Sequence, residues 1–152
     1  MNTEKKHKFR LIRVLMALLL WLGPALPAGA AEFNYHSLTE ALRLAKDQDK
    51  MVMIFFWADW CGYCIQIRRE VFSDPAVREV FDRNFLAVSV DVENDPEKLA
   101  RKFRIRPLPT LIFLKSDGEP AGFWPGAADR ETFFKLLEYL LKNNKGKEAP
   151  DV

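Results

Sequence analysis

Two cysteines separated by two residues are the part of this 152-residue chain best suited to chemistry. They are Cys61 and Cys64, and the sequence contains no other cysteine. One thiolate of such a pair can attack a disulfide bond, and the second can then displace the sulfur that has become attached. The pair closes too small a loop to stabilise a fold by restricting the unfolded chain. Its spacing therefore favours a reactive pair over a structural disulfide.

A zinc site is the main alternative for this pair. A structural zinc site needs about four protein ligands, and the sequence offers only two histidines besides the two cysteines. His7 lies in a segment that we expect to be removed, and His36 lies near a helix cap, where we assign it no role. A closed site would therefore have to borrow carboxylates. We expect neither a metal nor an organic cofactor.

The residues around the cysteines predict a strand that leads into a helix. Met51 to Trp57 is a continuous apolar run, which is typical of a strand covered on both faces. After it, Cys64, Ile67 and Val71 share one face of a helix. Cys61 would lie in the first helical turn, where free N–H groups and the helix dipole lower the pKa of a thiol from about 8.5. Cys61 is therefore the expected nucleophile, and Cys64 the thiol that resolves the mixed disulfide.

The rest of the chain predicts alternating helices and strands. Helix start signals occur at Ser37, at Asp74 and at Asp129. The other predicted elements are a short helix from Asp95 to about Phe103, strands at Phe85–Val92, Thr110–Leu114 and Ala121–Trp124, and a hairpin turn at Lys115–Gly118. This order indicates a parallel βαβ unit followed by a hairpin, in a central sheet with helices on both faces. Phe123 and Trp124 are expected in the core.

The first 30 residues have the layout of a secretory signal peptide. Basic residues precede the nine-residue apolar run Val14–Leu22, and the small residues Ala28-Gly29-Ala30 follow where a signal peptidase would cut. A membrane-spanning helix needs about 20 apolar residues, so retention by an uncleaved anchor is the less favoured alternative. We expect export to the periplasm with removal of residues 1–30, a single domain over residues 31–142 and a polar tail over residues 143–152.

The charge of the chain lies largely in that leader. The whole chain has a formal net charge of +2, but the leader holds five Lys or Arg and one Glu. The remainder has 18 basic and 20 acidic residues, for a net charge of −2. This balance gives no reason to expect binding to nucleic acid or to an anionic membrane. We therefore expect no nucleic-acid partner.

Two motifs resemble the thioredoxin superfamily, over roughly residues 33–141. The run Phe56–Cys64 resembles the active-site strand and turn of that superfamily, and Arg106–Thr110 resembles its later loop. The segment Glu70–Val77 is similar to the C-terminal thioredoxin-like domain of the membrane reductant transporter DsbD. The resemblance implies an α/β thioredoxin fold, in which a central mixed β-sheet is flanked by helices.

The resemblance also implies a substrate-binding surface. By that likeness Pro109 is a cis-proline that faces the cysteines, and Leu108 offers backbone hydrogen bonds to an extended substrate. Trp60 is expected to pack beside the cysteines as part of an apolar docking surface, which Gly62 and Tyr63 complete.

The chain departs from the cytoplasmic members of the superfamily at positions beneath the cysteines. Those proteins carry a buried Asp before the motif, paired with a Lys on the next strand. The matching position here is Phe55, and residues 87–90 contain no Lys. Glu70 and Asp59 are the candidates to replace that carboxylate, although a solvated role is the simpler interpretation of Asp59. Arg106 stands where many members have Gly, and it either contacts an acidic partner or is simply exposed.

Taken together, these features predict one catalytic domain, a monomer, that exchanges thiols and disulfides with protein substrates. The expected direction is reductive, with electrons supplied by a membrane redox partner. A redox-inert binding or chaperone module is one rival, and the intact cysteine pair with its proline loop argues against it. A copper carrier is the other, because thiolates suit Cu(I). The sequence has no Met cluster or second cysteine pair to support copper binding.

Overall fold

The computed structural model describes residues 33 and 35–144 of the chain. The expected signal peptide, residues 1–30, lies outside the described residues, as do residues 145–152 of the expected tail. Within the described part, no helix combines the length and the apolar character that a membrane-crossing segment requires. The described residues form the alternation of helices and strands that the sequence predicts.

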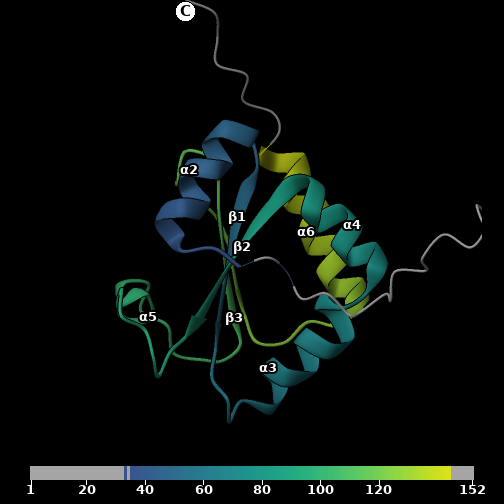
Figure 1. Ribbon diagram of the computed structural model, residues 1–152. Coiled ribbons are helices and arrows are strands. Elements are labelled where there is room, and N and C mark those ends of the chain that lie inside the picture. The colour runs from purple at the N-terminus through teal and green to yellow at the C-terminus, as the bar shows by residue number, and fades with distance from the viewer. Residues whose placement is uncertain (1–32, 34, 145–152) are drawn as a thin grey trace, which may run out of the picture. The chain divides into compact units, whose positions relative to one another are not determined.

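The centre of the fold is a four-stranded mixed sheet in the order β2-β1-β3-β4 (Figure 1). Strand β1 (Met51–Trp57) pairs in parallel with β2 (Phe85–Asp91) and antiparallel with β3 (Thr110–Leu114). Strand β4 (Pro120–Pro125) continues the sheet as the antiparallel partner of β3. The hairpin turn between them uses Gly118 at a φ of 87°, which L side chains rarely adopt. The predicted parallel βαβ unit and the predicted hairpin are both confirmed.

Helices cover both faces of this sheet. Within the described residues the helical segments are α2 (Leu38–Gln48), α3 (Gly62–Ile67), the π-helical segment η1 (Arg68–Phe72), α4 (Pro75–Asn84), α5 (Leu99–Lys102) and α6 (Arg130–Asn144). Figure 1 shows α2 and α5 on one side of the sheet and α3, α4 and α6 on the other. Cys61 directly precedes α3 and Cys64 lies in its first turn, so this second layer carries the cysteine pair.

Side-chain caps define where three of the helices begin. Ser37, Asp74 and Asp129 each accept a hydrogen bond from a backbone N–H group in the helix that follows. The Val77 N–H is the main reason that the pKa of the Asp74 carboxyl lies below its usual value. Asp74 is therefore charged at neutral pH and can interact favourably with the positive end of the α4 dipole. The three predicted start signals are confirmed.

The strand β1 divides the interior into two hydrophobic cores. Its side chains alternate, with Met51, Met53 and Phe55 on one face and Val52, Ile54 and Phe56 on the other. The face of Phe55 belongs to a core that also holds Cys61, Cys64, Phe72 and Phe133, which we call the cysteine-side core. The opposite face packs against α2 and α5. A strand covered on both faces is what the unbroken apolar run predicts.

The helix predicted from Asp95 to about Phe103 is wrong in its starting point. Helix α5 begins only at Leu99, because Lys98 adopts a left-handed conformation with a φ of 53°. The Asp95 carboxylate accepts a hydrogen bond from the Ala100 N–H at 2.7 Å. Asp95 thus caps the helix from five residues away, and the residues between form a turn.

The prediction that Phe123 is a core residue is also wrong, because its side chain is 58% exposed. Phe123 lies on β4, which is an edge strand of the sheet, and pairs with Ile112 on β3. On the other face of the same strand, Trp124 is partly buried against the cysteine-side core. Alternation along an edge strand therefore buries one of two adjacent aromatic rings and leaves the other in solvent.

Candidate active site

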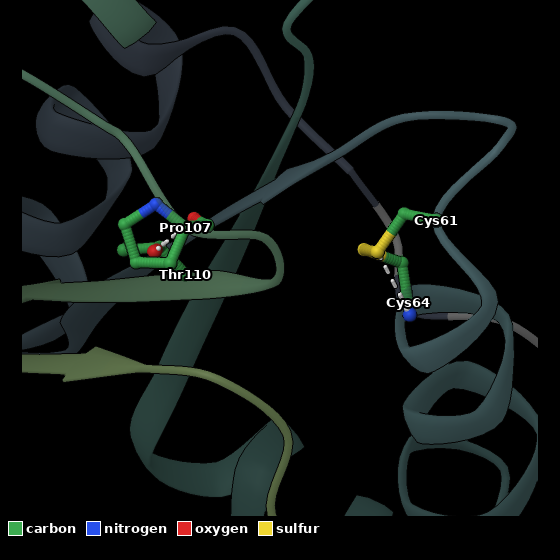
Figure 2. The surroundings of a disulfide bond; sticks show 4 residues. All are labelled: Cys61, Cys64, Pro107 and Thr110. Atoms are coloured by element: carbon green, nitrogen blue, oxygen red, sulfur yellow. Dashed lines mark hydrogen bonds between the residues drawn. A yellow bond between two sulfur atoms is a disulfide. The ribbon is translucent and has the colours of Figure 1, made fainter.

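A disulfide bond joins Cys61 and Cys64 where the loop after β1 enters helix α3 (Figure 2). The two Cα atoms are 5.2 Å apart. Cys61 is 5% exposed and Cys64 is 1% exposed. A substrate arriving from solvent can therefore reach the sulfur of Cys61 more easily than that of Cys64.

Cys61 is the N-cap residue of α3. Its backbone is extended, and its Sγ accepts a hydrogen bond from the Cys64 N–H at 3.2 Å. The helix continues from α3 directly into η1, so the donor belongs to a helical segment that extends to Phe72. An N–H donor and the positive end of a helix dipole both favour a thiolate over a thiol at Cys61 once the disulfide is reduced.

The loop that leads into β3 carries the second set of residues that the sequence predicts for the site, and Figure 2 draws two residues of this loop region, Pro107 and Thr110, in the surroundings of the disulfide. Its Leu108–Pro109 peptide bond is cis. Two hydrogen bonds hold the loop: the Thr110 hydroxyl donates to the Pro107 carbonyl, and the Gly126 N–H donates to the Pro109 carbonyl, both at 2.7 Å. Leu108 packs against the cysteine-side core, and its backbone groups have no hydrogen-bond partner among the described residues. The loop thus offers one donor and one acceptor to an incoming chain.

The other residues expected to bind substrate flank the cysteines on the surface. Trp60 does not pack into the interior, because its side chain is 69% exposed, and Tyr63 is exposed to a similar extent. No atom lies within 4 Å of where a Cβ on Gly62 would be. Trp60 and Tyr63 therefore present unpaired aromatic surface next to the reactive sulfurs.

The described part of the chain places no carboxylate in the interior near the disulfide. Phe55, at the position where cytoplasmic thioredoxins carry Asp, is fully buried. Both candidate replacements, Asp59 and Glu70, are exposed, and Glu70 accepts a hydrogen bond from the Gln66 side chain at 3.0 Å. Neither of them lies beneath the cysteines, so the site lacks an internal base of this kind among its described residues.

Sequence analysis misses Arg68, a charged residue of this region that is partly buried. Its guanidinium carbon lies 4.2 Å from the centre of the Trp57 ring and 5.6 Å from that of Phe55. The indole N–H of Trp57 in turn donates to the Ser89 hydroxyl at 2.8 Å. The available signal was the spacing, because Arg68 follows Cys64 by four residues and therefore lies on the same side of the helix.

The remaining candidates are Arg106, which precedes the loop residue Pro107, and His36. Arg106 is exposed and forms no ion pair with a described residue. His36 lies beside the cap of α2, with its Nδ1 3.7 Å from a carboxylate oxygen of Glu40. The described residues contain no group of three or more His, Cys, Asp or Glu side chains that could hold a metal ion.

Comparison with known proteins connects this arrangement to a large group of relatives. A family model described as a thioredoxin-like domain matches residues 38–141. The thiol:disulfide interchange protein DsbD of Photorhabdus laumondii is 32% identical over 113 residues, which are 72% of this chain and 19% of that protein. DsbD of Haemophilus influenzae is also 32% identical, over 76% of this chain and 21% of that protein. The chain thus spans about a fifth of the length of these curated relatives.

A solved structure supports the same relationship at the level of the fold. The solution structure of a thioredoxin from Thermus thermophilus aligns with a TM-score of 0.65 and 29% sequence identity, over 80% of this chain and all of that one. The predicted fold class, a central mixed β-sheet flanked by helices, is therefore confirmed.

Proposed function

The chain belongs to the thioredoxin-like family, and from this premise we propose that it is an exported protein thiol–disulfide oxidoreductase that works in the reductive direction. The observation that carries the proposal is the Cys61–Cys64 disulfide at the start of α3, with the more accessible sulfur at the N-cap. A structural crosslink of this spacing would do little for stability, whereas a redox couple needs one sulfur that is more accessible than the other.

The first step in the reductive direction is attack on a substrate. The Cys61 thiolate attacks one sulfur of the substrate disulfide, and a bond forms between these two sulfurs. The substrate disulfide breaks, and its other sulfur leaves as a thiolate that takes a proton from water. The helix start favours the thiolate form of Cys61 over the thiol, and the thiolate is the nucleophile.

The second step releases the substrate. The Cys64 thiolate attacks the Cys61 sulfur, the bond between Cys61 and the substrate breaks, and the second substrate sulfur leaves as a thiolate. Two electrons have then passed from the protein to the substrate, and the protein is left with the Cys61–Cys64 disulfide. A dithiol partner must reduce this disulfide before another turnover, and we propose a membrane redox protein for this role, by analogy with DsbD.

We propose that substrates bind as extended chains across the loop before β3. The free backbone groups of Leu108, next to Pro109, suit the main-chain hydrogen bonds of an added strand. Trp60 and Tyr63, on either side of Cys61, would contact apolar side chains near the substrate disulfide, and Gly62 leaves room for its backbone. This docking mode contacts the backbone, so it admits many protein sequences.

Reduction of insulin tests this proposal against a redox-inert binding or chaperone role. We expect the described domain to catalyse reduction of the insulin disulfides by dithiothreitol, measured as the turbidity of the released chains. A module that only binds unfolded chains would delay turbidity instead of accelerating it. Metal analysis of protein purified under reducing conditions would show stoichiometric copper only if the carrier alternative were correct.

We also predict that export removes residues 1–30. The leader combines a basic start, the apolar run Val14–Leu22 and the small residues before position 31. N-terminal sequencing of the exported protein should therefore begin at Ala31. A mature protein that begins at Met1 would show that the segment is kept as an anchor.

A further inference from the structure

Arg68 is a partly buried cation without an anionic partner among the residues that the structure describes. Its guanidinium group lies over Trp57 and near Phe55, at the distances given above, and its Nε is buried without a hydrogen-bond partner. It forms no ion pair with any described residue. Leaving a donor of a charged group unpaired in the interior costs free energy. Such a group therefore requires an explanation beyond packing alone.

The helix places Arg68 one turn after Cys64. The Arg68 N–H donates to the Cys64 carbonyl, and the helix changes to π geometry at Arg68. Helical side chains tilt toward the N-terminus, so the Arg68 side chain extends back over the turn that carries Cys64. The rings under its guanidinium group belong to β1, which leads directly into the cysteine loop. The charge and the sulfur therefore share one side of α3 and one packed core.

None of the other charged or titratable groups among the described residues of this region is a buried anion that could neutralise the Arg68 charge. On the elements that pack around α3 and η1, the groups to consider are Asp59, Tyr63, Arg69, Glu70, Tyr35, Asp91, Asp74 with Arg130, Arg78 with Asp82, and Glu131 with Lys135. No carboxylate among them is fully buried. When the disulfide is reduced, the thiolates are the anions that can form next to Arg68 in the core.

We propose that Arg68 is a positioning residue for the second half-reaction, whose charge stabilises the Cys64 thiolate when it displaces the substrate from Cys61. The inference rests on the proposed exchange function and assigns it a device for the resolving step. Burial alone disfavours a thiolate at Cys64. The proton of the Cys64 thiol passes to water, and the substrate sulfur leaves as a thiolate that is protonated from water, so charge and protons balance. The site thus uses a cation where a carboxylate base would otherwise promote the same step.

The size of the effect follows from Coulomb's law. For a unit charge about one helical turn away, at an effective dielectric of about 20, the interaction shifts a pKa by about two units. Replacing Arg68 by Gln should raise the pKa of the Cys64 thiol by about one unit or more. At neutral pH the fraction of Cys64 present as thiolate would fall about tenfold. The resolving step should slow by a similar factor.

The Cys61→Ser variant isolates the Cys64 sulfur for the first test. The pH dependence of its alkylation by iodoacetamide should give a pKa at or below about 8.5 with Arg68 present. Adding Arg68→Gln should raise this value by about one unit, and Arg68→Lys should restore most of the difference. Gln and Lys both lose the planar stack on Trp57, so a difference between them reports the charge. Arg69→Gln is the matched control, because Arg69 is the adjacent, exposed arginine.

Two-phase kinetics with dithiobis(nitrobenzoate) provide the second test in the protein with both cysteines. Attack by Cys61 releases the first coloured thiolate at a rate that depends on the reagent concentration. Attack by Cys64 releases the second at a rate that does not. We expect Arg68→Gln to slow only the second phase, about tenfold at pH 7, and Arg69→Gln to change neither phase.

The possible outcomes distinguish a failure of the role of Arg68 from a failure of the proposed thiol–disulfide exchange. Release of no coloured thiolate by the reduced wild type would refute the proposed function itself. Two normal phases that Arg68→Gln leaves unchanged would refute only the role of Arg68. If the Gln variant does not fold, the Cys61→Ser protein with Arg68 intact still provides a test, because a Cys64 pKa above about 8.5 would contradict the proposed stabilisation of its thiolate.

Discussion

Replacing Cys64 by Ser is expected to stop turnover and leave the physiological partner covalently attached to Cys61. Cys61 owes its activation to the start of α3, which this substitution leaves in place. It should therefore still attack a substrate disulfide. Serine cannot displace the linked sulfur, so the mixed disulfide persists, and insulin reduction falls to the uncatalysed rate. The adduct should appear on a non-reducing gel of the cell compartment and disappear on treatment with a reductant.

The Cys61→Ser variant is the matched control for this experiment. Cys64 is 1% exposed, so it should capture far less partner than Cys61 does in the reciprocal variant. Equal trapping by the two variants would contradict the assignment of nucleophile and resolving thiol. The identity of the trapped protein also reports the direction of electron flow: a membrane electron donor indicates a reductive pathway, and a quinone-linked oxidase an oxidative one.

Replacing Phe72 by Ala is expected to destabilise the oxidised protein by about 3–5 kcal/mol. The Phe72 side chain is 2% exposed, and its ring contacts those of Phe33, Phe55 and Phe133 at centroid distances of 5.0, 5.2 and 5.6 Å. Removing it leaves a cavity at the centre of the cysteine-side core that the neighbouring rings cannot fill. Urea unfolding followed by tryptophan fluorescence measures the change in the free energy of unfolding.

Phe123→Ala is the control with the same change of side chain. Because the Phe123 ring is largely in solvent, its loss should change stability by no more than about 0.5 kcal/mol. A cost at Phe123 that equals the cost at Phe72 would mean that Phe123 is covered in the folded protein, as the sequence alone suggested.

Local signals in the sequence were sufficient for most of the secondary structure. The unbroken apolar run at Met51–Trp57 and the side-chain caps at Ser37, Asp74 and Asp129 act through the backbone of their own neighbourhood. Such signals can be recognised in the sequence because they do not depend on residues far along the chain. The prediction of α5 was wrong in its starting point, because Lys98 adopts a left-handed conformation that is uncommon for residues other than glycine, and the helix begins only at Leu99.

The burial of side chains on edge strands is harder to predict from the sequence. Phe123 and Trp124 are adjacent aromatic residues, and hydrophobicity alone predicts that both are buried. Only the order of strands shows that β4 is at an edge of the sheet, where one face packs on the core and the other is left uncovered. The change of the cysteine helix to π geometry at η1 likewise has no local signature that sequence analysis detected.

By itself, the sequence determined that the two cysteines form a close pair at the start of a helix, because a cysteine pair after a buried strand is a local pattern. It also determined that no acidic residue stands at position 55. What replaces that carboxylate was decided by tertiary structure alone. Arg68 reaches the rings of Trp57 and Phe55 only because β1 and the cysteine helix pack together. An electrostatic environment is a sum over groups from separate elements, so it exists only once the chain has folded.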